Sequence, residues 1–171
     1  MATTIPDQVE NPGLNDYLEI MTRAVFQAGL SWSSIAHRWE AFRAAFEQFD
    51  VTRIAAYGDL DVDRLMHAEG MLHSARKIRA TIQNAQILLE LDGKYGGFTN
   101  YLRSFPDYEA LSKDFRRRFK FMGEMNVWYF LFRARERVPK FEHWVKTIPG
   151  DHPRMKEMVE KARSAGTSTE F

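Results

Sequence analysis

The chain has 171 residues, 44% hydrophobic and 13% aromatic, so it can bury one substantial core and is neither disordered nor a mini-protein. It contains no cysteine, which excludes disulfides and thiolate metal sites, and its five histidines lack the close spacing of zinc ligands. Neither a membrane-spanning apolar stretch nor a signal-peptide pattern is present, so we expect a cytoplasmic protein that uses no metal or other cofactor.

Hydrophobic periodicity predicts helices along almost the whole chain. Apolar residues recur at three- and four-residue spacing in the first two predicted helices, at Leu18, Met21, Val25, Ile35, Trp39, Phe42 and Phe46. Asp50 is predicted to cap a helix over 51–57, and Asp61 the next one, which continues to about residue 68. Gly70 ends that segment.

A long helix is predicted over 73–91, followed by a glycine-rich turn at 93–97. Shorter helices are predicted at 98–104, 112–118, about 123–135 and 153–164. No strand alternation of useful length appears, so we predict an all-α fold. Residues 1–13 and 165–171 are rich in Pro, Thr, Ser and Gly, and we expect flexible segments there, on either side of a helical domain at 14–164.

Basic residues gather in three runs, at 76–79, 113–120 and 133–140, although the formal net charge is only +1. A single run of this kind is usually a solvated helix face. Three runs in one chain favour a basic surface, which attracts polyanions.

Residues 112–135 have the pattern of two helices joined by a short apolar hairpin that closes on Gly123. A glycine there leaves the backbone amides of the second helix open to a phosphate, which is how a helix-hairpin-helix element binds DNA without reading its sequence. Any short helical turn that ends in glycine can imitate this motif, but the flanking basic residues favour DNA binding. The residues predicted to contact DNA are Arg116, Arg117, Arg118, Phe119, Lys120 and Gly123. The following helix is predicted to pack through Val127, Phe130, Leu131 and Ala134.

Several blocks follow one another in the chain: "FQAGLSW", "WEAFRAAFEQFD", "DVDRLMHAEGML", "KIRATIQNA", "LSK" and "FKFMG". Together, over about 17–132, they resemble the DNA-3-methyladenine glycosylase I (Tag) family of the helix-hairpin-helix glycosylase superfamily. The resemblance implies a monomeric enzyme of base excision repair that binds duplex DNA with a damaged base. Its reaction would be hydrolysis of the N-glycosidic bond of alkylated purines such as 3-methyladenine.

In that family the AGLSW segment forms part of the pocket that receives the extruded base, and its tryptophan stacks on the base. The resemblance therefore implies base contacts from Ala24, Gln27, Leu30, Ser31 and Trp32. An aromatic face suits a cationic methylated base through stacking and cation–π attraction. Considered alone, Trp32 is more typical of a residue that covers the core with its indole N–H at the surface, and it is the matched block that favours the pocket.

The chain also departs from the family pattern. The family has a glutamate where this chain has Ala24, and its zinc ligands have no counterparts here. Glu142 and Glu40 are candidate catalytic carboxylates, with Glu19 a further one, and each is also typical of a surface helix. The missing glutamate favours two alternatives: a catalytically silent DNA-binding protein, or a Tag-like fold reused to bind another small aromatic ligand.

Overall fold

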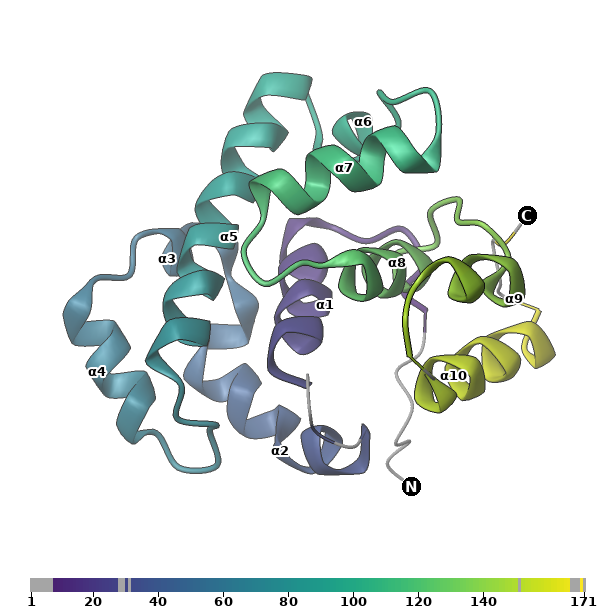
Figure 1. Cartoon of the computed structure of the whole chain (residues 1–171). Coiled ribbons are helices and arrows are strands. Elements are labelled where there is room, and N and C mark those ends of the chain that lie inside the picture. The colour runs from purple at the N-terminus through teal and green to yellow at the C-terminus, as the bar shows by residue number, and fades with distance from the viewer. Residues whose placement is uncertain (1–7, 28–29, 31, 151, 167–169, 171) are drawn as a thin grey trace.

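The computed structural model describes residues 8–27, 30, 32–150, 152–166 and 170, and only the backbone of Trp32 and Arg154. Within this part the regular elements are helices, and the single β-bridge joins Val138 to Glu170, so the predicted all-α fold is confirmed (Figure 1). The α-helices are α1 (Leu14–Gln27), α2 (Trp32–Ala45), α3 (Val51–Ala55), α4 (Asp59–His67), α5 (Ala75–Tyr95), α6 (Phe98–Leu102), α7 (Tyr108–Arg118), α8 (Glu124–Arg133), α9 (Phe141–Trp144) and α10 (Pro153–Ser164). Short 3₁₀ turns follow α2 at Glu47–Phe49 and α9 at Val145–Thr147.

Helix α1 lies in the middle of the molecule and packs against α5 on one side and α8 on the other. Helices α3, α4 and α6 also pack on α5, and α7 packs on α8. Figure 1 shows α4 and α10 at opposite ends of the molecule. This arrangement brings the segment between α7 and α8 next to α5, which precedes it by about 30 residues.

The core is built largely from aromatic rings. In one group Trp39 stacks on Phe42 and Phe49, with ring centroids 4.9 and 5.5 Å apart. In a second group Trp128 stacks on Phe132 and Trp144, at 4.9 and 5.2 Å. Such rings bury roughly 150–250 Å² each and therefore dominate the apolar burial that stabilises a small domain. The predicted core face of α8 is confirmed, because its members are at most 2% exposed: Val127, Phe130, Leu131 and Ala134.

The two predicted helix caps have different outcomes. Asp50 caps α3 as predicted, because its Oδ1 accepts a hydrogen bond of 3.1 Å from the Arg53 amide. The prediction for Asp61 is wrong, because α4 begins at Asp59 and its N-cap is Gly58. Asp61 is instead the third residue of α4, and its side chain accepts a 3.0 Å hydrogen bond from the amide of Gly58. An acid at this position accepts from the amide of the N-cap residue, whereas an N-cap side chain accepts from an amide further into the helix. Because acids are common in both positions, the sequence pattern did not separate the two.

The ends of the longer helices also differ from the prediction. Helix α5 begins after Ser74, whose side chain accepts a hydrogen bond from Lys77, and it continues past Gly93 to Tyr95. Its end is set by Gly96, which adopts the left-handed conformation at φ 67° that glycine tolerates best. Helix α7 begins four residues earlier than predicted, because Asp107 caps it. Helix α10 has the predicted bounds, whereas α9 was not predicted at all.

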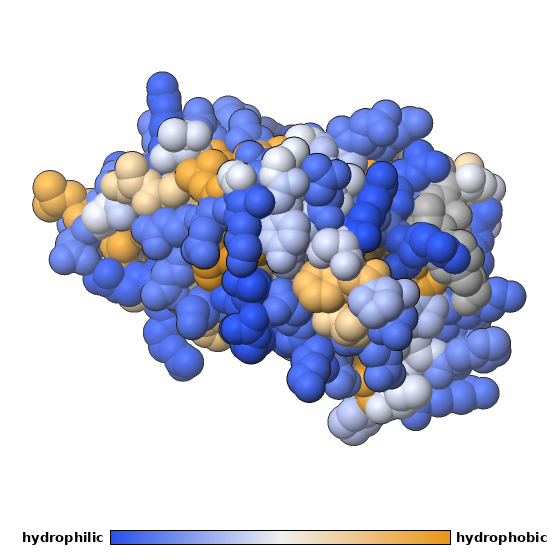
Figure 2. All heavy atoms as spheres, turned by 90° about the horizontal axis from the view of Figure 1, so that it is seen from above, coloured by the Kyte–Doolittle hydropathy of each residue, from blue (hydrophilic) through white to orange (hydrophobic). Residues whose placement is uncertain are grey.

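The described parts of the two terminal segments contact the domain. Val9 donates a 2.7 Å backbone hydrogen bond to the carbonyl of Arg133, and Gln8 donates a side-chain hydrogen bond to Phe132. Near the C-terminus, the Glu170 carboxylate is 4% exposed and accepts a 2.7 Å hydrogen bond from the amide of Phe141. Among the described helices none is long and apolar enough to cross a membrane. The face shown in Figure 2 is mostly hydrophilic, with small, separate apolar patches.

Candidate nucleic-acid interface and base site

A tight hairpin at 119–123 joins α7 to α8, as the sequence predicts. Phe119 and Met122 are each 3% exposed and pack into the core. The two residues between them, Lys120 and Phe121, form the exposed tip. Phe119 can therefore contribute to a DNA contact only through its backbone, whereas both tip side chains are available to a partner.

The backbone of the hairpin is held by Asn84 of α5, which is 1% exposed. Its side-chain Nδ2 donates to the carbonyl of Lys120 at 3.2 Å, and its Oδ1 accepts from the amide of the same residue at 2.8 Å. A buried amide with both ends paired fixes the hairpin relative to α5. Sequence reasoning missed this residue, although an asparagine between Ile82 and Ala85, on the apolar face of an amphipathic helix, was a signal for it.

Gly123 precedes α8 and has no side chain to cap the first amides of that helix. Its φ of −81° suits any residue. A side chain added there would meet no other atom within 4 Å of its Cβ. Neither the backbone conformation nor the packing at position 123 therefore requires glycine. Because glycine has no side chain that could cap the helix, the backbone amides at the N-terminus of α8 are open to an anion.

The arginines predicted to bind DNA all have acidic partners. Arg117 and Arg118 each form a 2.7 Å ion pair with Asp114, and Arg116 pairs with Glu124 at 3.3 Å. Burial acts to raise the pKa of Asp114, but hydrogen bonds from Arg117, Tyr101 and Arg118 outweigh it, so the pKa lies below its usual value. Lys120, by contrast, forms no ion pair with any acidic residue in the described part of the chain. Arg117 remains 67% exposed, so a phosphate can compete with Asp114 for it.

The predicted base site is described only in part. Ala24 is fully buried, and Gln27 and Leu30 are half-buried at the end of α1. The amide of Leu30 donates a 2.9 Å hydrogen bond to the carbonyl of Gln27. Ser31 and the side chain of Trp32 lie outside the described residues, so the predicted stacking of a base on Trp32 stays a prediction.

A cluster of charged residues lies on the face of α1 that meets α2. Glu19 accepts hydrogen bonds from Trp39 at 2.8 Å and from Arg43 at 2.9 Å. One turn further along, the Arg23 guanidinium lies 5.1 Å from the centre of the Trp39 ring, and its buried Nε has no hydrogen-bond partner among the described residues. Burial, aided by the nearby charge of Arg133, lowers the pKa of Arg23. Through its Oε2, Glu19 therefore holds α2 on α1.

The two candidate catalytic carboxylates lie far from each other in the fold, on α2 and α9. Glu40 is 86% exposed and pairs with Arg43 at 3.2 Å. Glu142 is bound by Arg163 of α10, whose Nη2 lies 2.8 Å from its Oε2. Hydrogen bonding from Arg163 lowers the pKa of Glu142 to about 2, against a smaller opposing effect of burial. Glu142 is thus ionised at neutral pH and has no proton to donate, and Arg163 is a partner that sequence reasoning missed.

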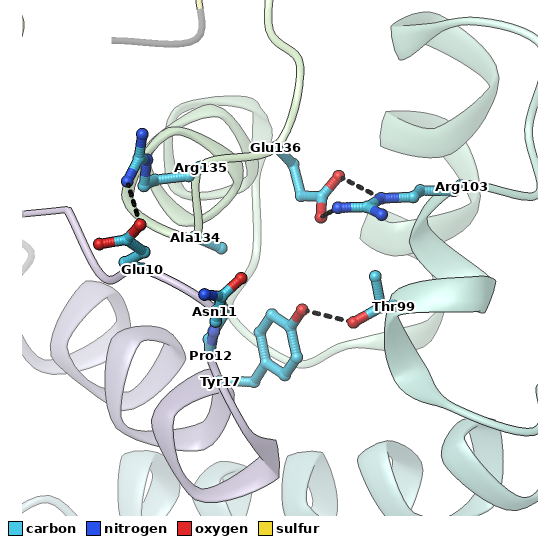
Figure 3. Close-up of a pocket in the computed structure, with 9 residues that line it drawn as sticks. All are labelled: Glu10, Asn11, Pro12, Tyr17, Thr99, Arg103, Ala134, Arg135 and Glu136. Atoms are coloured by element: carbon cyan, nitrogen blue, oxygen red, sulfur yellow. Dashed lines mark hydrogen bonds and ion pairs between the residues drawn. The ribbon is translucent and has the colours of Figure 1, made fainter. Parts of the chain in front are cut away.

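A polar cavity of about 470 Å³, which was not predicted, lies between the start of α1, α6 and the end of α8 (Figure 3). The Tyr17 hydroxyl and the Thr99 hydroxyl point toward each other and lie 2.9 Å apart. Arg103, which follows Thr99 at the end of α6, binds both carboxylate oxygens of Glu136, at 3.1 and 3.2 Å. Glu10 and Arg135 form a second ion pair in the lining, at 3.6 Å, so the charged side chains that line the cavity sum to zero.

The family resemblance implies zinc for relatives, and the absence of zinc from this chain stays a prediction. The sequence has no cysteine. Within the described part of the chain no group of three or more His, Asp or Glu residues is placed to hold a metal ion.

Comparison with known proteins adds independent findings. The sequence pattern of the methyladenine glycosylase family matches residues 10–122, which include α1 to α7 and most of the hairpin. DNA-3-methyladenine glycosylase 1 of Escherichia coli is 32% identical over 126 residues, which are 61% of this chain and 67% of the relative. The DNA-3-methyladenine glycosylase of Haemophilus influenzae is 30% identical over 126 residues, 61% of this chain and 68% of its own.

Solved structures agree with this similarity. The 3-methyladenine DNA glycosylase I of Staphylococcus aureus has a TM-score of 0.66 and 29% identity, and the match covers 76% of this chain and 80% of that chain. A variant of a 3-methyladenine DNA glycosylase I in complex with 3-methyladenine has a TM-score of 0.63 and 27% identity, and covers 75% of this chain and 78% of its own.

Proposed function

Because the chain belongs to the methyladenine glycosylase family, we propose that it is a DNA glycosylase of base excision repair. Its substrates are alkylated purines such as 3-methyladenine in duplex DNA, and it acts as a monomer. The observation that carries the proposal is the hairpin at 119–123, whose Lys120 backbone is fixed by the buried Asn84. A preset hairpin and an uncapped helix N-terminus bind the phosphates of a duplex without reading its sequence.

The proposed reaction adds water across the bond between the deoxyribose C1′ and the purine nitrogen, and it yields a free base and an abasic site. An alkylated purine carries a positive charge that is neutralised as this bond breaks, so departure of the base needs no general acid. Extrusion and positioning of the base then supply most of the catalysis. We assign stacking on the base to Trp32, entry into the duplex to Leu30, and the remaining pocket wall to Ala24, Gln27 and Ser31.

The carboxylates Glu142 and Glu40 enter this mechanism only as anions. Glu142 is ionised at neutral pH, and Glu40 is too exposed for its charge to act strongly at a distance. An anion near C1′ stabilises the positive charge that develops on the sugar. The variants Glu142→Gln and Glu40→Gln keep the side-chain shape and remove the charge, so they report separately on the two candidates.

The test is release of free bases from DNA treated with a methylating agent, measured by chromatography against DNA incubated without protein. We expect 3-methyladenine among the released bases, and slower release by the double variant Arg117→Ala/Lys120→Ala, which removes positive charge from the hairpin. The matched control is Lys156→Ala, which removes an exposed charge from α10. Binding of the methylated duplex with no release of any base would rule out the enzyme.

A second candidate function is favoured by Ala24, which is fully buried and has no polar side-chain atom where the resemblance implies a glutamate. A chain without that carboxylate is suited to a catalytically silent DNA-binding protein, or to a fold that holds another small aromatic ligand. The base-release assay, combined with a gel-shift assay of duplex binding, separates these alternatives. A catalytically silent binder shifts the duplex in the gel and releases no bases. A fold reused for another ligand neither shifts the duplex nor releases bases.

A further inference from the structure

Phe121 is exposed in a way that packing does not explain. Among the large apolar side chains that the structure describes, only Leu60 and Phe121 are exposed, at 88% and 42%. Phe121 also has a positive φ of 58°, a left-handed conformation that costs free energy in a bulky residue. A strained aromatic residue at the tip of a hairpin calls for a functional reason.

The strained backbone is held from two sides. The carbonyl of Phe121 accepts a 2.8 Å hydrogen bond from the side chain of Asn126 in α8. The preceding residue, Lys120, is held by Asn84 of α5 through two hydrogen bonds. The fold therefore fixes the backbone of Phe121 at the tip of the hairpin, where its side chain stays 42% exposed.

The ring has a cationic neighbour. The guanidinium of Arg76, in the first turn of α5, lies 5.5 Å from the centre of the Phe121 ring. In the described part of the chain Arg76 forms no ion pair and no hydrogen bond. By contrast, Arg79 on the same helix binds Asp59 at 3.0 Å. Arg76 is thus an exposed cation that is positioned by an aromatic ring and still has its donors available.

We propose that Phe121 and Arg76 act as one DNA-binding unit, in which the ring packs on an unstacked nucleobase and the guanidinium binds the flanking phosphate. The proposal rests on the proposed function, because the hairpin must already lie on the duplex. Aromatic rings stack on any base whose face is open, and arginine adds its charge and donors. In an intact duplex the base faces are covered by their neighbours, so the ring can engage only where stacking is interrupted. The unit therefore favours distorted or damaged DNA over intact DNA.

The variants are chosen so that a loss of binding does not report unfolding. Phe121→Gly removes the ring and at the same time relieves the strain, because glycine adopts positive φ readily. Phe121→Trp keeps an aromatic face. Arg76→Gln removes the charge, and Leu60→Ala is the control, since it removes an exposed apolar side chain from α4. Helical circular dichroism is recorded for each variant.

The experiment compares two otherwise identical duplexes, one intact and one with a tetrahydrofuran abasic-site analogue next to a 2-aminopurine. We expect Phe121→Gly to weaken binding to the distorted duplex about tenfold and to the intact one less than threefold, in line with the measured contribution of base–aromatic stacking. The parent and Phe121→Trp should quench 2-aminopurine fluorescence, and Phe121→Gly should not. Arg76→Gln should weaken both duplexes and lower the log–log salt slope by about one. Leu60→Ala should change nothing.

The outcomes separate this proposal from the proposed function. If Phe121→Gly binds both duplexes as tightly as the parent while Arg117→Ala/Lys120→Ala loses affinity, the hairpin binds DNA and the Phe121–Arg76 unit is overturned. The unit is also overturned if Phe121→Gly loses the same affinity for both duplexes and quenches 2-aminopurine fluorescence as the parent does. If the parent binds neither duplex, the DNA-binding function fails as well, and with it both proposals.

Discussion

The side chain of Asn84 and the backbone of Lys120, 36 positions apart, are joined by two hydrogen bonds, one donated in each direction. This pair connects the longest helix of the fold to the hairpin that we propose binds DNA. The backbone N–H and C=O of Lys120, which belong to two successive peptide units, are both bound by a single buried side-chain amide. The position of the hairpin tip therefore depends on α5 as well as on the residues of the hairpin.

Replacing Asn84 with alanine should lower the free energy of unfolding by about 1–3 kcal/mol, because it removes two part-buried hydrogen bonds to the Lys120 backbone, each worth about 0.5–1.5 kcal/mol. Urea denaturation measures this. The control is Gln86→Ala, which removes one exposed 3.0 Å hydrogen bond to Ala55 from the same helix and should cost less than about 1 kcal/mol. Equal effects of the two substitutions would mean that Asn84 does not hold the hairpin.

Replacing both Arg117 and Lys120 with alanine should weaken binding to all duplexes alike, whatever their sequence. Each phosphate that the variant no longer neutralises should flatten the log–log dependence of affinity on salt by about one, because fewer counterions are released on binding. Fluorescence anisotropy at several salt concentrations measures both quantities, with Lys156→Ala as the control. If the affinity and the salt slope are unchanged, the hairpin is not part of the DNA-binding interface.

The ion pair between Glu142 and Arg163 should make a pH-dependent contribution to stability. Since Arg163 lowers the pKa of Glu142 to about 2 in the folded chain, the pair stabilises the fold above the ordinary glutamate pKa of about 4.3 and loses that effect as the pH falls toward 2. Glu142→Gln should therefore be less stable than the parent at pH 7. The difference should be less than about 1 kcal/mol, because the Glu142 side chain is 49% exposed.

Urea denaturation of both proteins across pH 2 to 7 tests the sign of this effect, and the two stability curves should converge at the acidic end. A difference that stays constant from neutral to acidic pH would show that the substitution acts through packing and not through charge.

Replacing Trp32 with alanine should weaken binding to DNA that contains an alkylated or unpaired base by about 1–3 kcal/mol, the contribution of stacking on an aromatic ring. Intact duplex should be affected less, and helical circular dichroism should be unchanged. Titrations of matched damaged and intact duplexes measure the difference. If the variant unfolds, or if it binds both duplexes as tightly as the parent, Trp32 is a packing residue and does not stack on the base.

The purified protein should contain no stoichiometric zinc and should fold without it. The reason is the absence of cysteine together with five scattered histidines, which leave no set of ligands for a structural site. Elemental analysis of the pure protein, followed by circular dichroism after treatment with a chelator, measures both properties. One tightly bound metal per chain whose removal unfolds the protein would contradict the prediction.

The sequence by itself determined the local structure. Periodic apolar residues predicted the helices, Asp50 was correctly predicted as a cap, and the bounds of α10 matched the prediction. These features depend on residues within about four positions of each other, so a short window of sequence contains the whole cause. The hairpin that ends at Gly123 was predictable for the same reason.

Only the tertiary structure decided which side chains are paired and which are open to a ligand. The four-residue helix α9 has no period to detect, and it packs through Trp144, which stacks on Trp128. Glu142 was predicted as a catalytic candidate, yet Arg163, 21 positions away, occupies its carboxylate. Phe121 was part of a predicted hairpin, but its strain and its cationic neighbour Arg76 emerge only when α5 and the hairpin are brought together. Such pairings depend on how distant segments pack, because a side chain's burial and charge environment come from residues that the local sequence does not contain.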